Sequence, residues 1–445
     1  MHDHVTRHSR RDVLRYLGGG AAALAGASLA GGLPGAHATP GTPSTDAVAR
    51  WIGRHARPLR TLDPTARLDD LWPLVPRLAA STVVGLGAPY GASEPFLLRH
   101  RTARLLVEHL GFRAIAVEED WTKGLQLDHH VRTGEGDPRE LLADASLPWQ
   151  SDEMMALLAW MRAYNVRHPH DPVRFVGVDV VAVQDLAYDA VIAHVDAVAP
   201  HLGDQLRAHY VDLRPSGPIH AHINDYRQET DKQPFIDHAR AARALVAGLR
   251  GDGHELAEQH ARVIVAFHEY HASDLVAIRD TAMAEGVAFW SGHIGQRTVL
   301  LASNVHTAVA DPLTITWGDM PPAVQTSAGG HLRNRLGRRY ASVGYTFHHG
   351  EVNAGYPLVR YPVPAPAPDF FEATLGADDR GAYVLPLGVP RPRAVRGWLA
   401  SPLRTRAIGP FYDPARDPEF AMSSARAGNW FDFVVHTQTI TPTDV

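Results

Sequence analysis

Cysteine is absent from the 445-residue chain. Its absence excludes disulfide bonds, thiolate metal ligands and a cysteine nucleophile. Lysine occurs only at Lys123 and Lys232, and the formal net charge is −5. The chain as a whole therefore lacks the positive field that holds nucleic acid, and we expect no nucleic-acid partner. Hydrophobic residues make up 45% and charged residues 20% of the chain, which is typical of a folded globular protein.

The first 38 residues have the pattern of an export signal. Ser9-Arg10-Arg11-Asp12 is a twin-arginine motif, an uncharged stretch runs from 16 to about 32, and Ala36-His37-Ala38 resembles a cleavage site. Twin-arginine signals are read by a receptor and carry proteins that fold before export. We predict a twin-arginine-type signal peptide over 1–38, cleavage after Ala38 and secretion without stable membrane association. A membrane anchor or a disordered tail is the alternative.

The remaining residues, 39–445, are predicted to form one domain. Short β-rich runs alternate with helical stretches, a pattern that indicates an α/β fold with a largely parallel central sheet and flanking helices. Helices are expected at Glu94–Leu110 and Asp152–Asn165, and a helical insertion at about 181–292. The expected strands are Thr82–Leu86, Arg113–Val117, Val173–Val178, Thr298–Ala302, Leu313–Trp317, Tyr340–Phe347 and Phe431–Val435.

Polar residues follow four of these strands. They are Tyr90 after the first, Glu118 to Trp121 after the second, Asp179 after the third and Ser303 to His306 after the fourth. Ligands bind outside the carboxyl ends of parallel strands, so neighbouring strands would bring these groups to one rim. Burial after an apolar strand is expected to raise the pKa of Glu118, which would suit a general acid or base. His306 could move protons near neutral pH.

The 27 histidines do not form a metal pattern. The pairs His129-His130 and His348-His349 and the run 219–222 have no carboxylate or cysteine at ligand spacing, so we predict no metal site. The chain has no Gly-x-Ser-x-Gly motif for a serine nucleophile, and Gly85-Leu86-Gly87 is too short for a dinucleotide fingerprint. No cofactor is expected.

The motifs taken together resemble the erythromycin esterase family. The residues that carry the resemblance are 82–91 with Glu94, 111–118, Asp120-Trp121, Pro148-Trp149, Gly177, Asp179, Arg279-Asp280, 304–306 and Phe431-Asp432. The resemblance implies a metal-independent esterase that opens macrolactones. Members of this family have the signature Gly-Glu-x-x-His-Gly, whose His activates water, and a later His-Asn-x-His motif.

This chain departs from both motifs. The Glu position falls on Gly87, or on Ala88 if one residue is deleted, and the water-activating His is replaced by Tyr90. The first His of the later motif is Ser303, so His306 alone remains. Loss of a general base costs about 10²–10⁴ in rate. His306 could take over as the base with Glu118 orienting it, while Tyr90 donates a proton or stabilises an oxyanion. These roles give the expected Tyr90–Glu118–His306 catalytic constellation.

The predicted function is hydrolysis of an ester or lactone of a small natural product, by general acid/base activation of water. Two alternatives stay open. One is a ligand-binding or immunity protein that retains the cleft without turnover, and the other is a biosynthetic tailoring enzyme for a cyclisation or elimination. The substrate, the oligomeric state and the choice between a resistance and a biosynthetic role also stay open. The residues expected to bind substrate are Arg99, Glu94, Asn304, Ser303, Trp121 and Asp179.

Overall fold

A nine-stranded mixed sheet forms the centre of the protein. The computed structural model describes residues 45–445 except 274, 356 and 410–411, so the predicted signal peptide lies outside the described residues. The strand order is β1-β10-β13-β8-β2-β5-β3-β4, and β9 pairs with β8. The strands are β1 (Arg57–Pro58), β2 (Val83–Gly87), β3 (Phe112–Asp120), β4 (Arg174–Asp179), β5 (Arg297–Ala302), β8 (Tyr340–Ala354), β9 (Val359–Val363), β10 (Ala382–Pro386) and β13 (Phe433–Ile440).

The six strands from β13 to β4 run parallel to one another, whereas β1, β9 and β10 are antiparallel to their neighbours. The predicted α/β class with a largely parallel sheet is therefore confirmed. One predicted strand, 313–317, lies elsewhere, because β6 belongs to a separate antiparallel sheet of order β11-β12-β6-β7. The members of this sheet are β6 (Leu313–Trp317), β7 (Ala323–Gln325), β11 (Arg404–Arg406) and β12 (Phe420–Ser423).

The central strands are apolar on both faces, as strands covered by helices on both sides must be. Successive side chains of a strand point to opposite faces. Val84 packs in one core cluster and Val83 in the other, and Ile115 and Ala116 divide in the same way. The near-continuous apolar runs that predicted these strands thus supply two cores at once.

Helices cover both faces of the sheet. One face packs against α3 (Val75–Leu78), α4 (Ser93–Leu110) and α7 (Asp152–Arg167). Both α4 and α7 have common end signals: Gly111 follows α4 with φ 72°, and the Ser151 side chain accepts the Met154 N–H at the start of α7. The other face packs against α13 (Val276–His293) and α15 (Ala328–Leu336).

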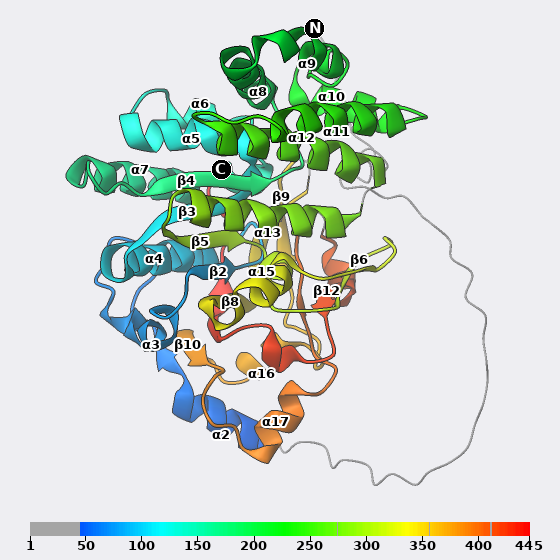
Figure 1. Cartoon of the computed structure of the whole chain (residues 1–445). Helices are drawn as coiled ribbons and strands as arrows, with labels where there is room; N and C mark the ends of the chain where they lie inside the picture. Colours follow the sequence, from blue (N-terminus) through cyan, green and yellow to red (C-terminus); the bar gives the residue numbers. More distant parts are fainter. Residues whose placement is uncertain (1–44, 274, 356, 410–411) are drawn as a thin grey trace, which may run out of the picture.

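Between the end of β4 and the start of β5, the described residues form helices and loops. Five of these helices, shown in green at the top of Figure 1, form a cap above the sheet, while α2 (Thr45–His55) contacts α17 (Arg393–Leu399) at the opposite end of the view. The five are α8 (Asp185–Val198), α9 (Gly203–Tyr210), α10 (Ile219–Gln228), α11 (Gln233–Ala247) and α12 (His254–Ser273). Within the described residues, no helix is both long and apolar enough to cross a membrane.

Candidate active site

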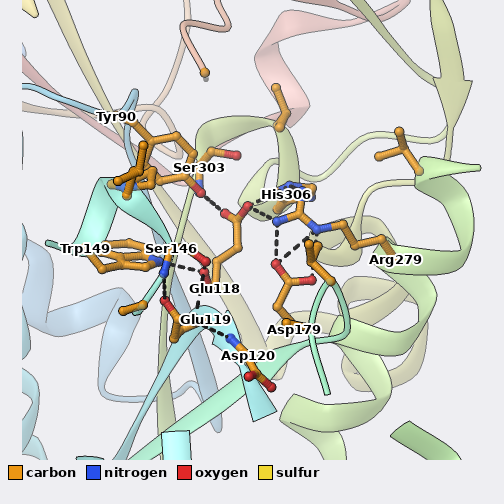
Figure 2. A pocket seen from close by; sticks show the side chains of 18 of the residues that line it. Tyr90, Glu118, Glu119, Asp120, Ser146, Trp149, Asp179, Arg279, Ser303 and His306 are labelled. Atoms are coloured by element: carbon orange, nitrogen blue, oxygen red, sulfur yellow. Dashed lines mark hydrogen bonds and ion pairs between the residues drawn. The ribbon is translucent and has the colours of Figure 1, made fainter. Parts of the chain in front are cut away.

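A cavity of about 220 Å³ opens at the carboxyl ends of the parallel strands. β2, β5, β3 and β4 are adjacent in the sheet, so the loops that follow them meet at one rim. Tyr90 comes from the loop after β2, Glu118 from the end of β3, Asp179 from the end of β4, and His306 from α14 (Asn304–Thr307) after β5. Figure 2 shows these side chains pointing toward one another. The cap contributes residues to the opposite wall, among them Ile219 and Ile223 of α10.

Glu118 lies at the centre of the site and accepts four hydrogen bonds. One oxygen accepts from Arg279 Nη2 at 2.6 Å and lies 3.1 Å from His306 Nε2. The other accepts from the backbone N–H of Ser303 at 2.9 Å and from the Tyr90 hydroxyl (Figure 2). The side chain is 3% exposed. Glu118 therefore joins three of the four strand-end segments in one polar cluster.

The expected direction of the Glu118 pKa is wrong. Burial alone would raise the pKa, but the neighbouring charges of His306 and Arg279 outweigh it and hold the pKa of this carboxyl well below its usual range. Only the burial of Glu118 is visible in the sequence, because the two cations come from segments more than 150 residues away in the chain. Glu118 is thus an ionised carboxylate at neutral pH.

His306 is held between two carboxylates. Its Nδ1 lies 2.8 Å from Asp280 Oδ1 at the start of α13, and its Nε2 faces Glu118. Burial opposes the charged form of the imidazole, but Glu118 and Asp280 raise the pKa of His306 to about 10. At neutral pH the side chain is therefore an imidazolium, with both ring N–H groups as donors.

Tyr90 is the residue that the sequence resemblance places at the family's water-activating His. Burial and the charge of Glu118 raise the pKa of the Tyr90 phenol, so the hydroxyl stays protonated and acts as a donor. Its ring packs edge-on against Trp149 at 5.6 Å. The missing family carboxylate also has a packing reason, because a Cβ at Gly87 would lie 1.9 Å from Thr307 Oγ1.

Three of the expected binding residues also lie at the cavity. Asp179 accepts two hydrogen bonds from Arg279 Nε, at 2.9 and 3.0 Å. Ser303 and Asn304 line the wall next to Glu118, and Asn304 Nδ2 donates to the Tyr345 carbonyl at 2.9 Å. The structure thus brings these residues together with the three expected catalytic residues.

Three other expected binding residues do not line the cavity. Trp121 is core: it stacks on Trp290 at 5.0 Å. Glu94 accepts the backbone N–H of Thr441 at 2.7 Å, which ties α4 to the C-terminal segment. Arg99 is buried outside the cavity lining, and its guanidinium is 5.6 Å from the centre of the Trp149 ring. A strand-end or helix position alone does not tell on which side of the backbone a side chain lies.

Sequence reasoning missed the roles of two functional neighbours, Arg279 and Asp280. These adjacent residues of α13 face one cluster: Arg279 pairs with Glu118 and Asp179, and Asp280 pairs with His306. Asp280 is fully buried and also accepts the Ala328 N–H at 2.7 Å. The Arg-Asp pair was visible as one of the motifs, but its partners lie in β3, β4 and the segment after β5.

The described part of the chain contains no candidate metal site. No group of three or more His, Asp or Glu side chains there has a spacing that could hold a metal ion. The His348–His349 pair, one of the sequence candidates, has its two Nδ1 atoms 3.0 Å apart. The prediction that no cofactor is used stays a prediction.

The fold and the site define an α/β protein with a buried carboxylate–imidazolium–guanidinium cluster at the carboxyl ends of its parallel strands. A family model described as erythromycin esterase matches residues 107–440, that is, 334 of the 445 residues. The chain belongs to the erythromycin esterase family. The match begins after the segment that contains Gly87 and Tyr90, where the sequence departs from the family signature.

Two individual proteins are similar to this chain. Erythromycin esterase type II from Escherichia coli is 28% identical over 131 residues, which cover 29% of this chain and 31% of the relative. The match thus spans about a third of that protein's length. A Bacillus cereus protein of known structure is 26% identical, with a TM-score of 0.79 over 90% of this chain and 99% of its own.

A more distant structure shares the fold. A variant of the erythromycin esterase EreC, in its open conformation, is 18% identical with a TM-score of 0.67, covering 86% of this chain and 97% of that one. Its similarity supports the α/β architecture described above.

Proposed function

We propose that this protein hydrolyses an ester or lactone of a small natural product without using a metal. The observation that carries the proposal is one hydrogen-bonded chain at the cavity, in which Tyr90, Glu118, His306 and Asp280 follow one another. Membership of the erythromycin esterase family supports hydrolysis as the reaction class.

The protonation states of this chain suit the polarisation and departure steps of ester cleavage. The Arg279 guanidinium donates to the carbonyl oxygen, where negative charge develops, and the Tyr90 hydroxyl joins it once its single proton turns from Glu118 to the substrate. The His306 imidazolium gives a proton to the departing alkoxide. Glu118 keeps these three donors in place and, through its negative charge, keeps His306 protonated.

The second candidate function is ligand binding without turnover. It is favoured by one observation: neither Glu118 nor His306 is a good base at neutral pH, because Glu118 has a lowered pKa and His306 is already protonated. The same cluster of donors would bind an ester or lactone tightly and leave it intact.

The test compares turnover of a panel of aryl esters and macrolactones by the wild type, His306→Ala and Glu118→Gln. We expect both variants to lose about 10²–10⁴ in kcat/KM, as removal of acid–base groups does. Glu94→Gln is the control, because Glu94 contacts Thr441 outside the cavity and its loss should leave kcat/KM unchanged. Activity that survives both site substitutions would refute the assignment.

The same panel separates hydrolysis from binding. No turnover, together with ligand-dependent thermal stabilisation that His306→Ala abolishes, would favour the binding function. Tyr90→His restores the family residue, and we expect it to increase esterase activity if the scaffold remains competent.

We also propose that the protein is exported through the twin-arginine route. The support is the Arg10-Arg11 motif with its uncharged stretch, and the lack of cysteine, which leaves no disulfide to form after export. Replacing both arginines by lysine should retain the full-length chain in the cytoplasm. Continued secretion of this double variant would contradict the proposal.

A further inference from the structure

A second carboxyl, Glu119, lies beside Glu118 in the same cavity. Neighbouring residues of a regular strand point to opposite faces. The pairing of β3 with β4 shifts register between Val117 and Asp120, and at this irregularity Glu118, Glu119 and Asp120 all line the cavity. Figure 2 shows Glu119 below Trp149 and next to Ser146. The irregular strand end therefore supplies more than one carboxyl to the site.

Glu119 differs from its neighbours in having no cation. Glu118 and Asp179 share Arg279, whereas no ion pair is found for Glu119 among the described residues. Its oxygens accept the backbone N–H groups of Asp120 and Ser146, both at 2.8 Å, and the Ser146 hydroxyl at 3.4 Å, while the residue is 2% exposed. A buried carboxyl with neutral donors alone holds its proton more tightly than a paired one.

The acidic groups around Glu119 also favour its protonated form. Asp120 on its own strand and Asp179 on β4 are both acidic, and the Arg279 cation on α13 is held by Glu118 and Asp179. Asp144, from the loop before Ser146, is paired with Lys123. Burial, with the charge of Asp120, raises the pKa of Glu119 to about 8. Proton uptake and release by Glu119 thus fall near neutral pH.

Asp120 is buried like Glu119, but its side chain has a structural role. It caps α5 (Trp121–Thr133) by accepting the Thr122 N–H at 2.9 Å, and its two oxygens also accept from the Thr122 hydroxyl. Glu119 caps no helix, which leaves it as the cavity carboxyl that the site described above does not use.

We propose that Glu119 is the general base of this enzyme, the group that takes the proton from the attacking water in place of the histidine that Tyr90 replaces. The inference rests on the proposed hydrolysis. The water oxygen bonds to the carbonyl carbon while its proton passes to the Glu119 carboxylate. The bond from that carbon to the leaving oxygen then breaks, and the alkoxide takes a proton from His306. Proton return from Glu119 to His306 closes the cycle, so water and ester give acid and alcohol.

The test is the pH dependence of kcat/KM for an aryl ester that the wild type cleaves. We expect wild-type kcat/KM to rise with pH and level off above about pH 8, where Glu119 is ionised. Glu119→Gln keeps the shape of the side chain but removes the base, so kcat should fall by about 10²–10⁴ with little change in KM, and the rise near pH 8 should disappear. Glu372→Gln is the matched control, since Glu372 is a buried carboxyl with a raised pKa outside the cavity.

A second variant distinguishes chemistry from structure. In Glu119→Ala, added formate should restore part of kcat, because a small carboxylate can enter the vacated space and act as base. Wild-type turnover with an unchanged pH profile in Glu119→Gln, or no rescue in a folded Glu119→Ala, would overturn this inference and leave the proposed hydrolysis standing. Absence of wild-type turnover on every ester would instead overturn the proposed hydrolysis, and this inference with it.

Discussion

Arg279 is the cation whose removal should disturb the site most. It forms ion pairs with Glu118 and Asp179 at the cavity, and its own side chain is only 16% exposed. The cluster contains three carboxylates, those of Glu118, Asp179 and Asp280, and two cations, Arg279 and His306. Arg279→Met retains much of the side-chain volume but leaves His306 as the one cation among the three carboxylates.

The expected loss of stability is about 3–5 kcal/mol, the cost of breaking a buried ion pair by removing one partner. Most of this cost comes from the carboxylates that stay buried without compensation. We therefore expect Arg279→Met with Asp179→Asn to be less destabilised than the sum of the two single substitutions, by about 1–3 kcal/mol. The pKa of Glu118 should rise in Arg279→Met, because one of the two cations that lower it is gone.

The assay is urea-induced unfolding at pH 7 of the wild type, the two single variants and the double variant. Arg262→Met is the control, since Arg262 pairs with Glu258 while 45% exposed and should cost less than about 1 kcal/mol. A loss below about 1 kcal/mol for Arg279→Met, or strict additivity in the double variant, would refute the reasoning that the cluster is a buried, mutually dependent unit.

Three further predictions concern stability. Because the folded-state pKa of Glu119 is raised to about 8, its contribution to stability is full below its unfolded pKa near 4.5 and lost as the pH rises through 8. At pH 9 the free energy of unfolding of Glu119→Gln should therefore exceed that of the wild type by a few kcal/mol, at about 1.4 kcal/mol per pKa unit. Urea-induced unfolding measures this difference, and an equal or lower stability of the variant at pH 9 would contradict the prediction. Gly91→Ala should lower the Tm strongly, because φ is 73° and the new Cβ would lie 1.8 Å from the Asn353 carbonyl oxygen. Gly111→Ala, where φ is 72° and no atom lies near the new Cβ, should lower the stability by only about 1–2 kcal/mol. Equal losses of stability for the two glycine variants in calorimetry would count against the packing argument. Trp121→Phe should lower the Tm without changing KM, whereas a changed KM at unchanged Tm would restore the substrate-contact role expected from the sequence.

The sequence by itself determined the class of fold and the rim at which the candidate site lies. Apolar runs such as those of β2 and β5, each followed by polar residues, are local signals, and parallel strands place their carboxyl ends at one rim whatever their order. The family motifs likewise identified Glu118 and His306, and the departures at Gly87, Tyr90 and Ser303, because these depend only on residue identity and spacing.

Only the tertiary structure decided the charge state of the site. A pKa depends on which charges lie within a few ångströms, and the charged neighbours of Glu118 come from α14 and α13, far away in the chain. Long-range packing also placed the Trp121 side chain in the core, and the irregular pairing of β3 brought Glu119 to the cavity. The pattern of residues thus specified which groups are present, and the folded chain determined which of them hold protons and which of them line the cavity.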